Sequence, residues 1–321
     1  MNPTRRAWLA SGVLLAFAGT AAAQAFPERP LTFVVPFAAG SATDQLARAI
    51  GQAITQQTKQ QVIVDNRAGA NGFIGAQLAA KAKPDGYTVF ITTNTTHAAN
   101  EHLFRKLPYD PVKDFEPLTL LGRGGQIMVV NEQSPANSVG DFIKLAKERP
   151  GKLSFGWGSS SSRIAGELFK QMTGTYIVSI PYKSNPPAIT DLMGGQIDMM
   201  ITDMSTGLPQ VKAGKLKALG VSTSKRSALA PEVPTLSEAG VKGYEMTYWF
   251  AAYAPAGTPA PVVARLNELL VAAAKSPAAS GFYTSSGTDV LTSTPEELRK
   301  FQHAESQKWS KVITAAGIEK E

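Results

Sequence analysis

Short apolar runs and segments with helical periodicity alternate along most of the chain. The apolar runs are rich in β-branched and aromatic residues, which predicts buried strands at 31–37, 61–66 and 87–93. Between them, 42–58 and 72–82 repeat apolar residues at the spacing of one helix face and predict helices. The same rhythm returns from residue 152 to 223. Strands that alternate with helices over this length predict an α/β fold with parallel sheets.

Two segments interrupt this rhythm and predict crossings between two domains. In 121–138, three glycines precede an apolar strand and a Ser-Pro-Asn turn cluster. In 241–261, an aromatic strand ends in a turn rich in proline and glycine. A chain that crosses twice leaves its first domain discontinuous. Two domains joined in this way can close around a ligand by a hinge motion.

The first 23 residues have the layout of a cleavable secretory signal. Arg5 and Arg6 precede an apolar run from Trp8 to about Ala18, and small residues lead to a predicted cleavage after Ala23. The run is too short to span a bilayer, and no later run of eighteen apolar residues follows it. We therefore expect an exported protein, with both ordinary secretion and the twin-arginine route open to it.

The composition argues mainly against certain partners, namely nucleic acids, metal ions and cofactors. The formal charge is +7, but no block of lysine and arginine with interleaved aromatic residues indicates a nucleic-acid partner. The chain has no cysteine, and its three histidines lack metal-ligand spacing, so we expect neither disulfides nor a metal site. The glycines of "GANGFIG" do not match the dinucleotide fingerprint, and no cofactor is predicted.

The loop "PFAAGSATD" (36–44) collects hydrogen-bond donors between a predicted strand and a predicted helix. Its small residues leave the backbone N–H groups from Ala39 to Thr43 bare at a helix N-terminus, where the helix dipole favours an anion. Thr43 or Asp44 also fits the role of helix cap, and a cap and an anion site can coexist.

The loop "GWGSSSSR" (156–163) has a similar character in the second half of the chain. Its glycines permit close backbone approach, its serines supply hydroxyl and N–H groups, and Arg163 supplies a fork for a carboxylate. A serine cap with a surface arginine explains the same residues without a ligand. The presence of one such loop in each predicted domain favours a pair of anion sites.

Several motifs in order resemble the Bug-type periplasmic solute receptors of the tripartite tricarboxylate transporters. Among them are "PFAAGSATDQLAR", "VDNRAGANGFIGAQLAAKAKPDGYT", "IPYKSNPPAITDLMGGQIDMM" and "APEVPTLSEAG". The resemblance runs from about residue 27 to the C-terminus. It implies a two-lobed periplasmic binding protein of the type II, or Venus flytrap, class, which has no catalytic activity, is a monomer, and hands a small carboxylate to membrane permease subunits. It also implies a signal peptide at 1–23, a first lobe at 24–125 and 246–321, and a second lobe at 126–245.

The resemblance places the candidate ligand-binding residues. In the family, the first loop holds one ligand carboxylate through its backbone and ordered water; here Ser41 replaces a usual glycine. In the second lobe, Arg163 stands where the family usually has a histidine. Asp203 would repel an anion, so we expect it to orient neighbouring side chains. The candidates are Phe37, Ala39, Gly40, Ser41, Thr43, Asp44, Thr93, Asn94, His97, Trp157, Gly158, Ser159, Ser160, Ser161, Ser162, Arg163, Tyr182, Lys183 and Asp203.

An aromatic dicarboxylate, with terephthalate as the leading example, fits these candidates. One carboxylate would lie on the first loop and the other on the serines and Arg163, with the ring between Phe37 and Trp157. An aliphatic di- or tricarboxylate such as citrate is the alternative ligand. A secreted hydrolase using one of the serines at 159–162 is a remote alternative, because the chain offers no G-x-S-x-G elbow and only distant histidines.

Overall fold

The first lobe is built on the strand and helix pattern expected from the sequence. The computed structural model describes residues 26–321, so the predicted signal peptide at 1–23 lies outside the described residues. The helix predicted at 42–58 has those bounds in the structure. The elements of this lobe before the first crossing are β1 (Leu31–Val35), α1 (Ala42–Thr58), β2 (Val62–Asn66), a 3-10 turn (Ala70–Gly72), α2 (Phe73–Ala80), β3 (Thr88–Thr93), a π-helical turn (Thr95–Ala99) and α3 (Asn100–Leu103).

Strand β1 explains why this lobe has a core on both faces of its sheet. It pairs in parallel with β2 on one side and with β3 on the other. Phe33 packs into the apolar cluster that includes α1 and α8 (Ala260–Ala274), and Val34 packs into the cluster on the opposite face. A strand covered on both faces is apolar at successive positions, which is the pattern the sequence has at 31–35.

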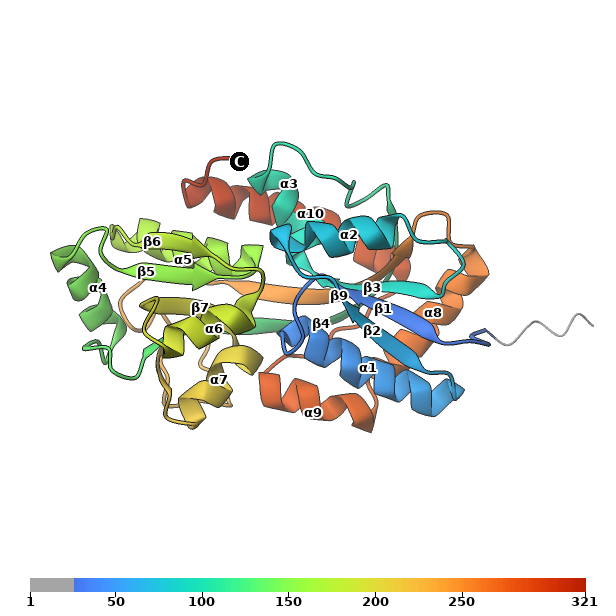
Figure 1. Cartoon of the computed structure of the whole chain (residues 1–321), viewed down its shortest axis with the longest axis horizontal. Coiled ribbons are helices and arrows are strands. Elements are labelled where there is room, and N and C mark those ends of the chain that lie inside the picture. Colours follow the sequence, from blue (N-terminus) through green and yellow to red (C-terminus); the bar gives the residue numbers. More distant parts are fainter. Residues whose placement is uncertain (1–25) are drawn as a thin grey trace, which may run out of the picture.

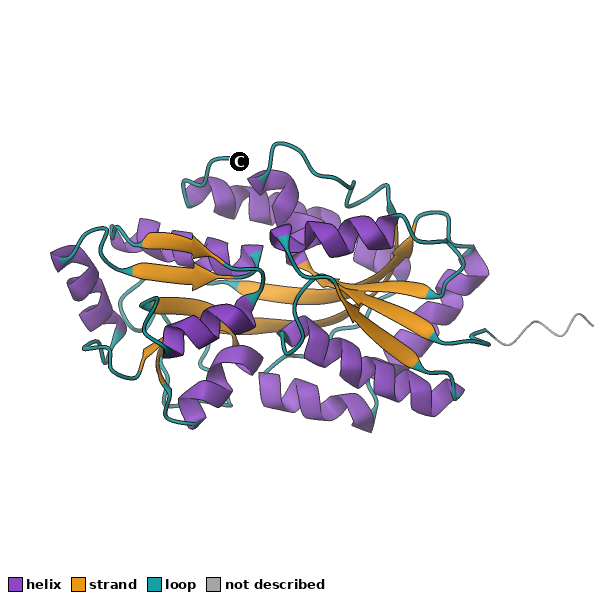
Figure 2. Ribbon diagram, viewed as in Figure 1, coloured by secondary structure: helices purple, strands orange, loops and turns teal. Residues whose placement is uncertain are grey.

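The second lobe repeats the arrangement of strands followed by helices. Parallel strands β5, β6 and β7 lie side by side, each followed by a helix. Figure 2 shows these helices packed about the sheet of this lobe. The elements are α4 (Val139–Glu148), β5 (Ser154–Trp157), α5 (Ser160–Thr173), β6 (Val178–Pro181), α6 (Asn185–Met193), β7 (Met199–Asp203), α7 (Met204–Lys212) and β8 (Leu216–Val221).

Two long strands join the lobes, and they make the sheet mixed rather than all parallel. Strand β4 (Phe115–Asn131) and strand β9 (Thr247–Pro255) run antiparallel to each other and pass from one lobe to the other (Figure 1). Strand β9 is also antiparallel to β3, and β4 is antiparallel to β7 and β8. The strand order is β2-β1-β3-β9-β4-β7-β5-β6, with β8 paired to β4. The expectation of parallel sheets therefore holds within each lobe and fails at the crossings.

The glycines of the first crossing are packing residues of a strand and not a flexible linker. A Cβ atom on Gly122 would lie 2.8 Å from Thr288 Cγ2, and one on Gly124 would lie 2.5 Å from the Tyr248 hydroxyl oxygen. Both glycines belong to β4, which continues through the segment that the sequence pattern marked as a linker. Their absent side chains allow β4 to pack tightly against its neighbours.

After the second crossing, the chain returns to the first lobe and completes it with helices. Helix α8 packs beside α1, and α9 (Pro277–Ser286) also contacts α1. The last helix, α10 (Pro295–Ala315), contacts the π-helical turn in the first lobe and α5 in the second. None of the helices in residues 26–321 is long and apolar enough to cross a membrane.

Candidate functional site

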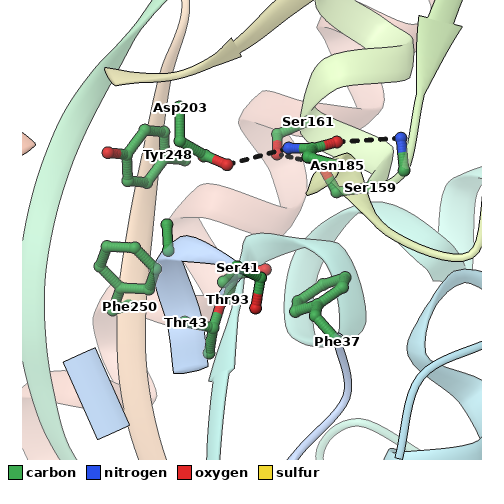
Figure 3. A pocket seen from close by; sticks show the side chains of 12 residues that line it. Phe37, Ser41, Thr43, Thr93, Ser159, Ser161, Asn185, Asp203, Tyr248 and Phe250 are labelled. Carbon is green, nitrogen blue, oxygen red and sulfur yellow. Dashed lines mark hydrogen bonds between the residues drawn. The ribbon is translucent and has the colours of Figure 1, made fainter. Parts of the chain in front are cut away.

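A cavity lies between the lobes, where strands from both of them end. The space free of atoms within it is about 310 Å³. The first lobe contributes the start of α1 and the end of β3, the second lobe contributes the starts of α5 and α6, and the crossing strand β9 contributes two aromatic rings (Figure 3). The lining residues are Phe37, Ser41, Ala42, Thr43, Thr93, Gly158, Ser159, Ser161, Asn185, Asp203, Tyr248 and Phe250.

Helix α1 is capped by Ser41, which corrects the expected cap at Thr43 or Asp44. The Ser41 hydroxyl oxygen accepts a hydrogen bond from the Asp44 N–H at 3.3 Å, and Asp44 Oδ2 accepts one from the Gly40 N–H at 2.9 Å. The Ser41 N–H donates to the Ala38 carbonyl oxygen at 3.1 Å. The donors at Gly40 and Ser41, expected to be bare, are therefore already used by the loop itself.

The free donors of this loop are the first two N–H groups of the helix. The N–H groups of Ala42 and Thr43 have no acceptor among the described residues, and both residues line the cavity. The dipole of this 17-residue helix places partial positive charge at the same point. Free N–H groups at a helix N-terminus are typical of anion-binding sites.

Helix α5 presents a matching end from the second lobe. Its cap is Ser159, whose hydroxyl oxygen accepts from the Ser162 N–H at 3.3 Å. The N–H groups of Ser160 and Ser161 have no acceptor within residues 26–321. Ser161 lines the cavity, with its hydroxyl oxygen 3.1 Å from that of Ser159. The cavity is thus bounded by two helix N-termini, one from each lobe.

Asn185 holds the second-lobe side of the cavity together. Its Oδ1 accepts hydrogen bonds from the Gly158 N–H and from the Ser162 hydroxyl, both at 3.0 Å. Its Nδ2 donates to Asp203 Oδ2 at 2.9 Å (Figure 3). The sequence analysis missed Asn185, although the two prolines that follow it in "KSNPP" are typical of a helix start.

Gly158 is where the chain passes closest to this asparagine. A Cβ atom at this position would lie 1.9 Å from the backbone carbonyl carbon of Ser184 and 2.3 Å from the Asn185 nitrogen. Real Cβ atoms do not approach backbone this closely, so only glycine fits at residue 158. The glycine is thus required by the packing of two loops, as expected for close backbone approach.

Asp203 is the only ionisable carboxyl group in the cavity lining, and no lysine, arginine or histidine lines the cavity with it. Burial raises the pKa of Asp203, while the hydrogen bond from Asn185 acts in the opposite direction. Tyr248 and Phe250 complete the lining from β9, and burial together with the nearby Asp203 raises the pKa of Tyr248 well above its ordinary value. The sequence analysis missed both rings, because an aromatic strand does not reveal which of its faces meets a ligand.

Trp157 and Arg163, both predicted to contact the ligand, lie outside the lining of this cavity. The Trp157 indole N–H donates to the Ser179 hydroxyl at 2.7 Å. The Arg163 guanidinium lies 5.1 Å over the Trp157 ring and forms an ion pair with the Glu321 side chain. The Trp157 N–H and one Arg163 nitrogen are therefore used within the protein, while Nε and Nη1 of Arg163 are buried without a partner among the described residues.

His97 also lies away from the cavity, in the core of the first lobe. It is fully buried, its ring stacks on Tyr253 with the ring centres 3.9 Å apart, and its Nδ1 is 2.9 Å from the Thr96 hydroxyl oxygen. Burial lowers the pKa of His97 from 6.5 to about 3. The ring is therefore neutral at physiological pH and packs as part of the core of the first lobe.

The remaining candidates separate into those that line the cavity and those that do not. Tyr182 donates its hydroxyl to Asp191 Oδ2 at 2.7 Å, and the Lys183 side chain is exposed. The candidates in the lining are Phe37, Ser41, Thr43, Thr93, Gly158, Ser159, Ser161 and Asp203. Those outside it are Ala39, Gly40, Asp44, Asn94, His97, Trp157, Ser160, Ser162, Arg163, Tyr182 and Lys183.

Ser160 contacts the opposite lobe beside the cavity. Its hydroxyl donates to Asn100 Oδ1 at 2.8 Å, and Asn100 Nδ2 is bound to the Tyr109 hydroxyl oxygen at 3.1 Å. All three side chains are buried. This hydrogen bond joins α5 of the second lobe to α3 of the first.

The serine cluster lacks the partners of a nucleophile. The hydroxyl groups of Ser159, Ser161 and Ser162 bond to one another and to Asn185, and within residues 26–321 no histidine bonds to them. The described residues also contain no group of three or more histidine and carboxylate side chains placed to hold a metal ion. The arrangement is therefore one of donors around a cavity and offers no activated base.

Comparison with known proteins agrees with this geometry. The family model described as the tripartite tricarboxylate transporter family receptor matches residues 46–318. Protein BugT of Bordetella pertussis is 34% identical over 312 residues, which cover 95% of this chain and 96% of BugT. A UPF0065 protein from the tcbD-tcbE intergenic region of Pseudomonas sp. strain P51 is 37% identical over 293 residues, covering 90% of this chain and 87% of that protein.

Solved structures of similar proteins have the same fold. The periplasmic binding protein BugD superposes with a TM-score of 0.88 at 32% identity, covering 92% of this chain and all of BugD. An R. palustris protein solved with adipate gives 0.89 at 36% identity with the same coverage, and MatC from Rhodopseudomonas palustris with bound malate gives 0.84 at 31% identity, covering 90% of this chain and all of MatC. The chain therefore belongs to the receptor family of the tripartite tricarboxylate transporters, a family of substrate-binding proteins and not of enzymes.

Proposed function

We propose that the protein is a periplasmic receptor that binds a small dicarboxylate between its lobes and delivers it to the membrane permease of a tripartite tricarboxylate transporter. The observation that carries this proposal is the pair of helix N-termini, α1 and α5, that face one cavity with free N–H groups. Each helix end carries about half a positive charge, so two ends can hold two carboxylates without a cationic side chain.

The hinge is part of the proposal. We infer that the first lobe comprises 24–125 and 246–321 and the second lobe 126–245, and that the lobes open and close about the paired strands β4 and β9. The hydrogen bond between Ser160 and Asn100 supports a closed arrangement, because it joins the two lobes beside the cavity. Opening would expose the free N–H groups of both helices to solvent and to an incoming ligand.

An apolar middle section is the second feature that we assign to the ligand. Phe37, Tyr248 and Phe250 line the cavity, and their buried rings favour contact with carbon atoms over contact with further polar groups. Terephthalate has such a middle section between two carboxylates, so it is the aromatic candidate. Its support now comes from these three rings, since Trp157 and Arg163 lie elsewhere.

Adipate is the second candidate, and a specific observation favours it. The R. palustris protein solved with adipate is 36% identical to this chain over 92% of its length. Adipate also has two carboxylates separated by an apolar section. Citrate carries more charge and more polar groups, so it would gain less than either dicarboxylate from the aromatic rings of the lining.

Titration calorimetry on the mature protein tests the proposal with terephthalate, adipate, malate, citrate and benzoate. We expect terephthalate or adipate to bind most tightly, and benzoate to bind at least about tenfold more weakly because it lacks a second carboxylate. The proposal fails if none of the dicarboxylates binds, or if citrate binds more tightly than terephthalate and adipate do.

A backbone substitution tests the carboxylate site itself. Ala42→Pro removes one N–H group at the first helical position, where proline is tolerated, and the preceding Ser41 has the extended backbone (φ −66°, ψ 158°) that proline requires. We expect its dicarboxylate affinity to fall by about ten- to 150-fold, which corresponds to the roughly 1.5 to 3 kcal/mol of a hydrogen bond to a charged group. Ala42→Gly keeps the N–H group and is the matched control, which should bind like wild type.

A further inference from the structure

Asp203 presents a contradiction within a carboxylate site. It lines the cavity with 9% of its surface exposed, at the point where β7 ends and α7 begins. Among the described residues no cationic side chain lines the cavity, so only the partial charges of the helix N-termini oppose its charge, and a bound carboxylate would compete for them. An ionised Asp203 would repel a carboxylate at 4 Å by about 1 to 4 kcal/mol, depending on how much water screens the pair. An ionised Asp203 would therefore weaken the binding of a carboxylate in this cavity.

The hydrogen bonds of Asn185 define which oxygen of Asp203 is free. Asn185 Oδ1 already accepts from the Gly158 N–H and the Ser162 hydroxyl, so its Nδ2 must be the donor to Asp203 Oδ2. Asp203 Oδ1 makes no hydrogen bond to any side chain in the described part of the chain. One oxygen is thus held by a donor, and the other is left to carry a proton and to face a ligand.

Within residues 26–321, the groups around Asp203 stabilise its negative charge only through the hydrogen bond from Asn185 and through helix dipoles, since Asp203 itself precedes α7. Strand β9 contributes Tyr248, whose phenol stays neutral because burial and Asp203 itself raise its pKa. Strand β4 contributes Gln126 opposite Asp203 in the sheet, and α7 contributes the hydroxyl groups of Ser205 and Thr206. Helices α1 and α5 contribute no charged side chain to the lining. Burial raises the pKa of the Asp203 carboxyl, against the opposing effect of the Asn185 hydrogen bond.

We propose that Asp203 takes up a proton from solvent when a dicarboxylate binds, and that its carboxyl group then donates a hydrogen bond to one carboxylate of the ligand. The step forms one O–H bond on Asp203 and breaks none in the ligand. It rests on the proposed function, since it needs an anionic ligand in this cavity. It turns the one repulsive group of the site into a donor.

This coupling links affinity to pH with a definite sign. The bound anion disfavours the ionised form of Asp203, so the bound protein keeps its proton to a higher pH than the free protein does. Between those two pH values, binding takes up close to one proton and the Kd rises as much as about tenfold for each pH unit. Below this range Asp203 is protonated before binding, and above it the weaker ionised complex forms without proton uptake.

Calorimetry in buffers of different ionisation enthalpy measures the protons directly. Wild type is titrated with terephthalate and with adipate from about pH 6 to about pH 8.5, and the dependence of binding enthalpy on buffer enthalpy gives the number of protons taken up. We expect net proton uptake on binding, and a Kd that rises with pH. Binding of either dicarboxylate without proton uptake, at a Kd constant over the range, overturns the inference while leaving the proposed function intact.

Asp203→Asn is the matched variant, because its amide is neutral at every pH and still has an N–H group to donate. We expect it to bind with a Kd that does not change with pH, and the proton uptake that remains in the variant measures the ligand's own titration. Asp191→Asn, outside the cavity lining, should keep the wild-type proton uptake. If Asp203→Asn weakens binding more than tenfold while wild type takes up no proton, the complex requires the ionised form of Asp203, and the inference is wrong. If neither wild type nor variant binds a dicarboxylate, the proposed function fails, and this inference fails with it.

Discussion

The buried histidine of the first lobe gives the sharpest prediction about stability. His97 is fully buried against Tyr253, and burial lowers its pKa from 6.5 to about 3. In the unfolded chain the imidazole titrates near 6.5. Below that pH the imidazole is protonated in the unfolded state but stays neutral in the folded state. The free energy of unfolding therefore falls as the pH falls from 6.5 toward 3.

The size of the effect follows from the width of this pH window. Each pH unit within it lowers the free energy of unfolding by about 1.4 kcal/mol, so a change from about pH 6.5 to about pH 5.0 costs roughly 2 kcal/mol. His97→Phe keeps an aromatic ring beside Tyr253 and removes the titration. We expect the variant to gain about 2 kcal/mol relative to wild type over this interval, whatever its stability at neutral pH.

Urea denaturation at a series of pH values measures both proteins. The quantity compared is the difference in free energy of unfolding between His97→Phe and wild type at each pH. His303→Gln replaces an exposed histidine on α10 and controls for removing a histidine elsewhere. A difference that stays constant from about pH 6.5 to about pH 5.0 would refute the reasoning, since it would mean that His97 takes up its proton in the folded state.

Three further substitutions probe the cavity and the contact between the lobes. Gly158→Ala places a Cβ atom 1.9 Å from the backbone that precedes α6, so calorimetry should give at least about tenfold weaker dicarboxylate binding; wild-type affinity would contradict the close packing of these loops. Ser160→Ala removes the hydroxyl that donates to Asn100, and we expect ligand dissociation, measured by stopped flow, to be about 2- to 12-fold faster, whereas an unchanged rate would show that this bond does not hold the lobes closed. Glu321→Gln weakens the ion pair with Arg163, in which Glu321 is largely exposed, and should lower the free energy of unfolding by about 0.2 to 1 kcal/mol without changing dicarboxylate affinity; a tenfold change in Kd would mean that Arg163 acts on the ligand after all.

The sequence predicts the local elements well, because they depend on local patterns. Helix α1 has the predicted bounds because its apolar spacing is regular and Ser41 precedes it as a cap. The two loops at the strand ends were found for a similar reason, since small and hydroxyl residues gather where backbone donors are exposed. Both loops contribute residues to the cavity.

Contacts between distant segments limited the prediction of the site. Arg163 offers a fork suited to a carboxylate, but the carboxylate it meets belongs to Glu321, 158 residues further along the chain. Asn185 was missed because its importance comes from three partners on other elements, which no local pattern reveals. Of the N–H groups predicted to be free from Ala39 to Thr43, those of Gly40 and Ser41 are used within the loop, which no local pattern reveals.

The continuous strand through the first crossing was not predicted, for a different physical reason. Clustered glycines usually mark turns, and the segment 121–138 contains three glycines. In the structure these glycines make room for side chains of neighbouring segments, such as Tyr248, and the strand β4 continues past them. A single sequence does not distinguish a glycine that makes room for a neighbouring side chain from a glycine that makes the backbone flexible.

The paired strands β4 and β9 have a consequence for how two weak contacts combine. A flexible tether would allow a wide range of distances between the two helix ends. A ligand bound to one end would then rarely be close to the other. A ladder of backbone hydrogen bonds between two strands instead restricts the lobes to bending and twisting about one line. In the complex that we propose, the second helix end would therefore stay at a high effective concentration near the first, and a dicarboxylate held by both would bind more tightly than one held by either contact alone.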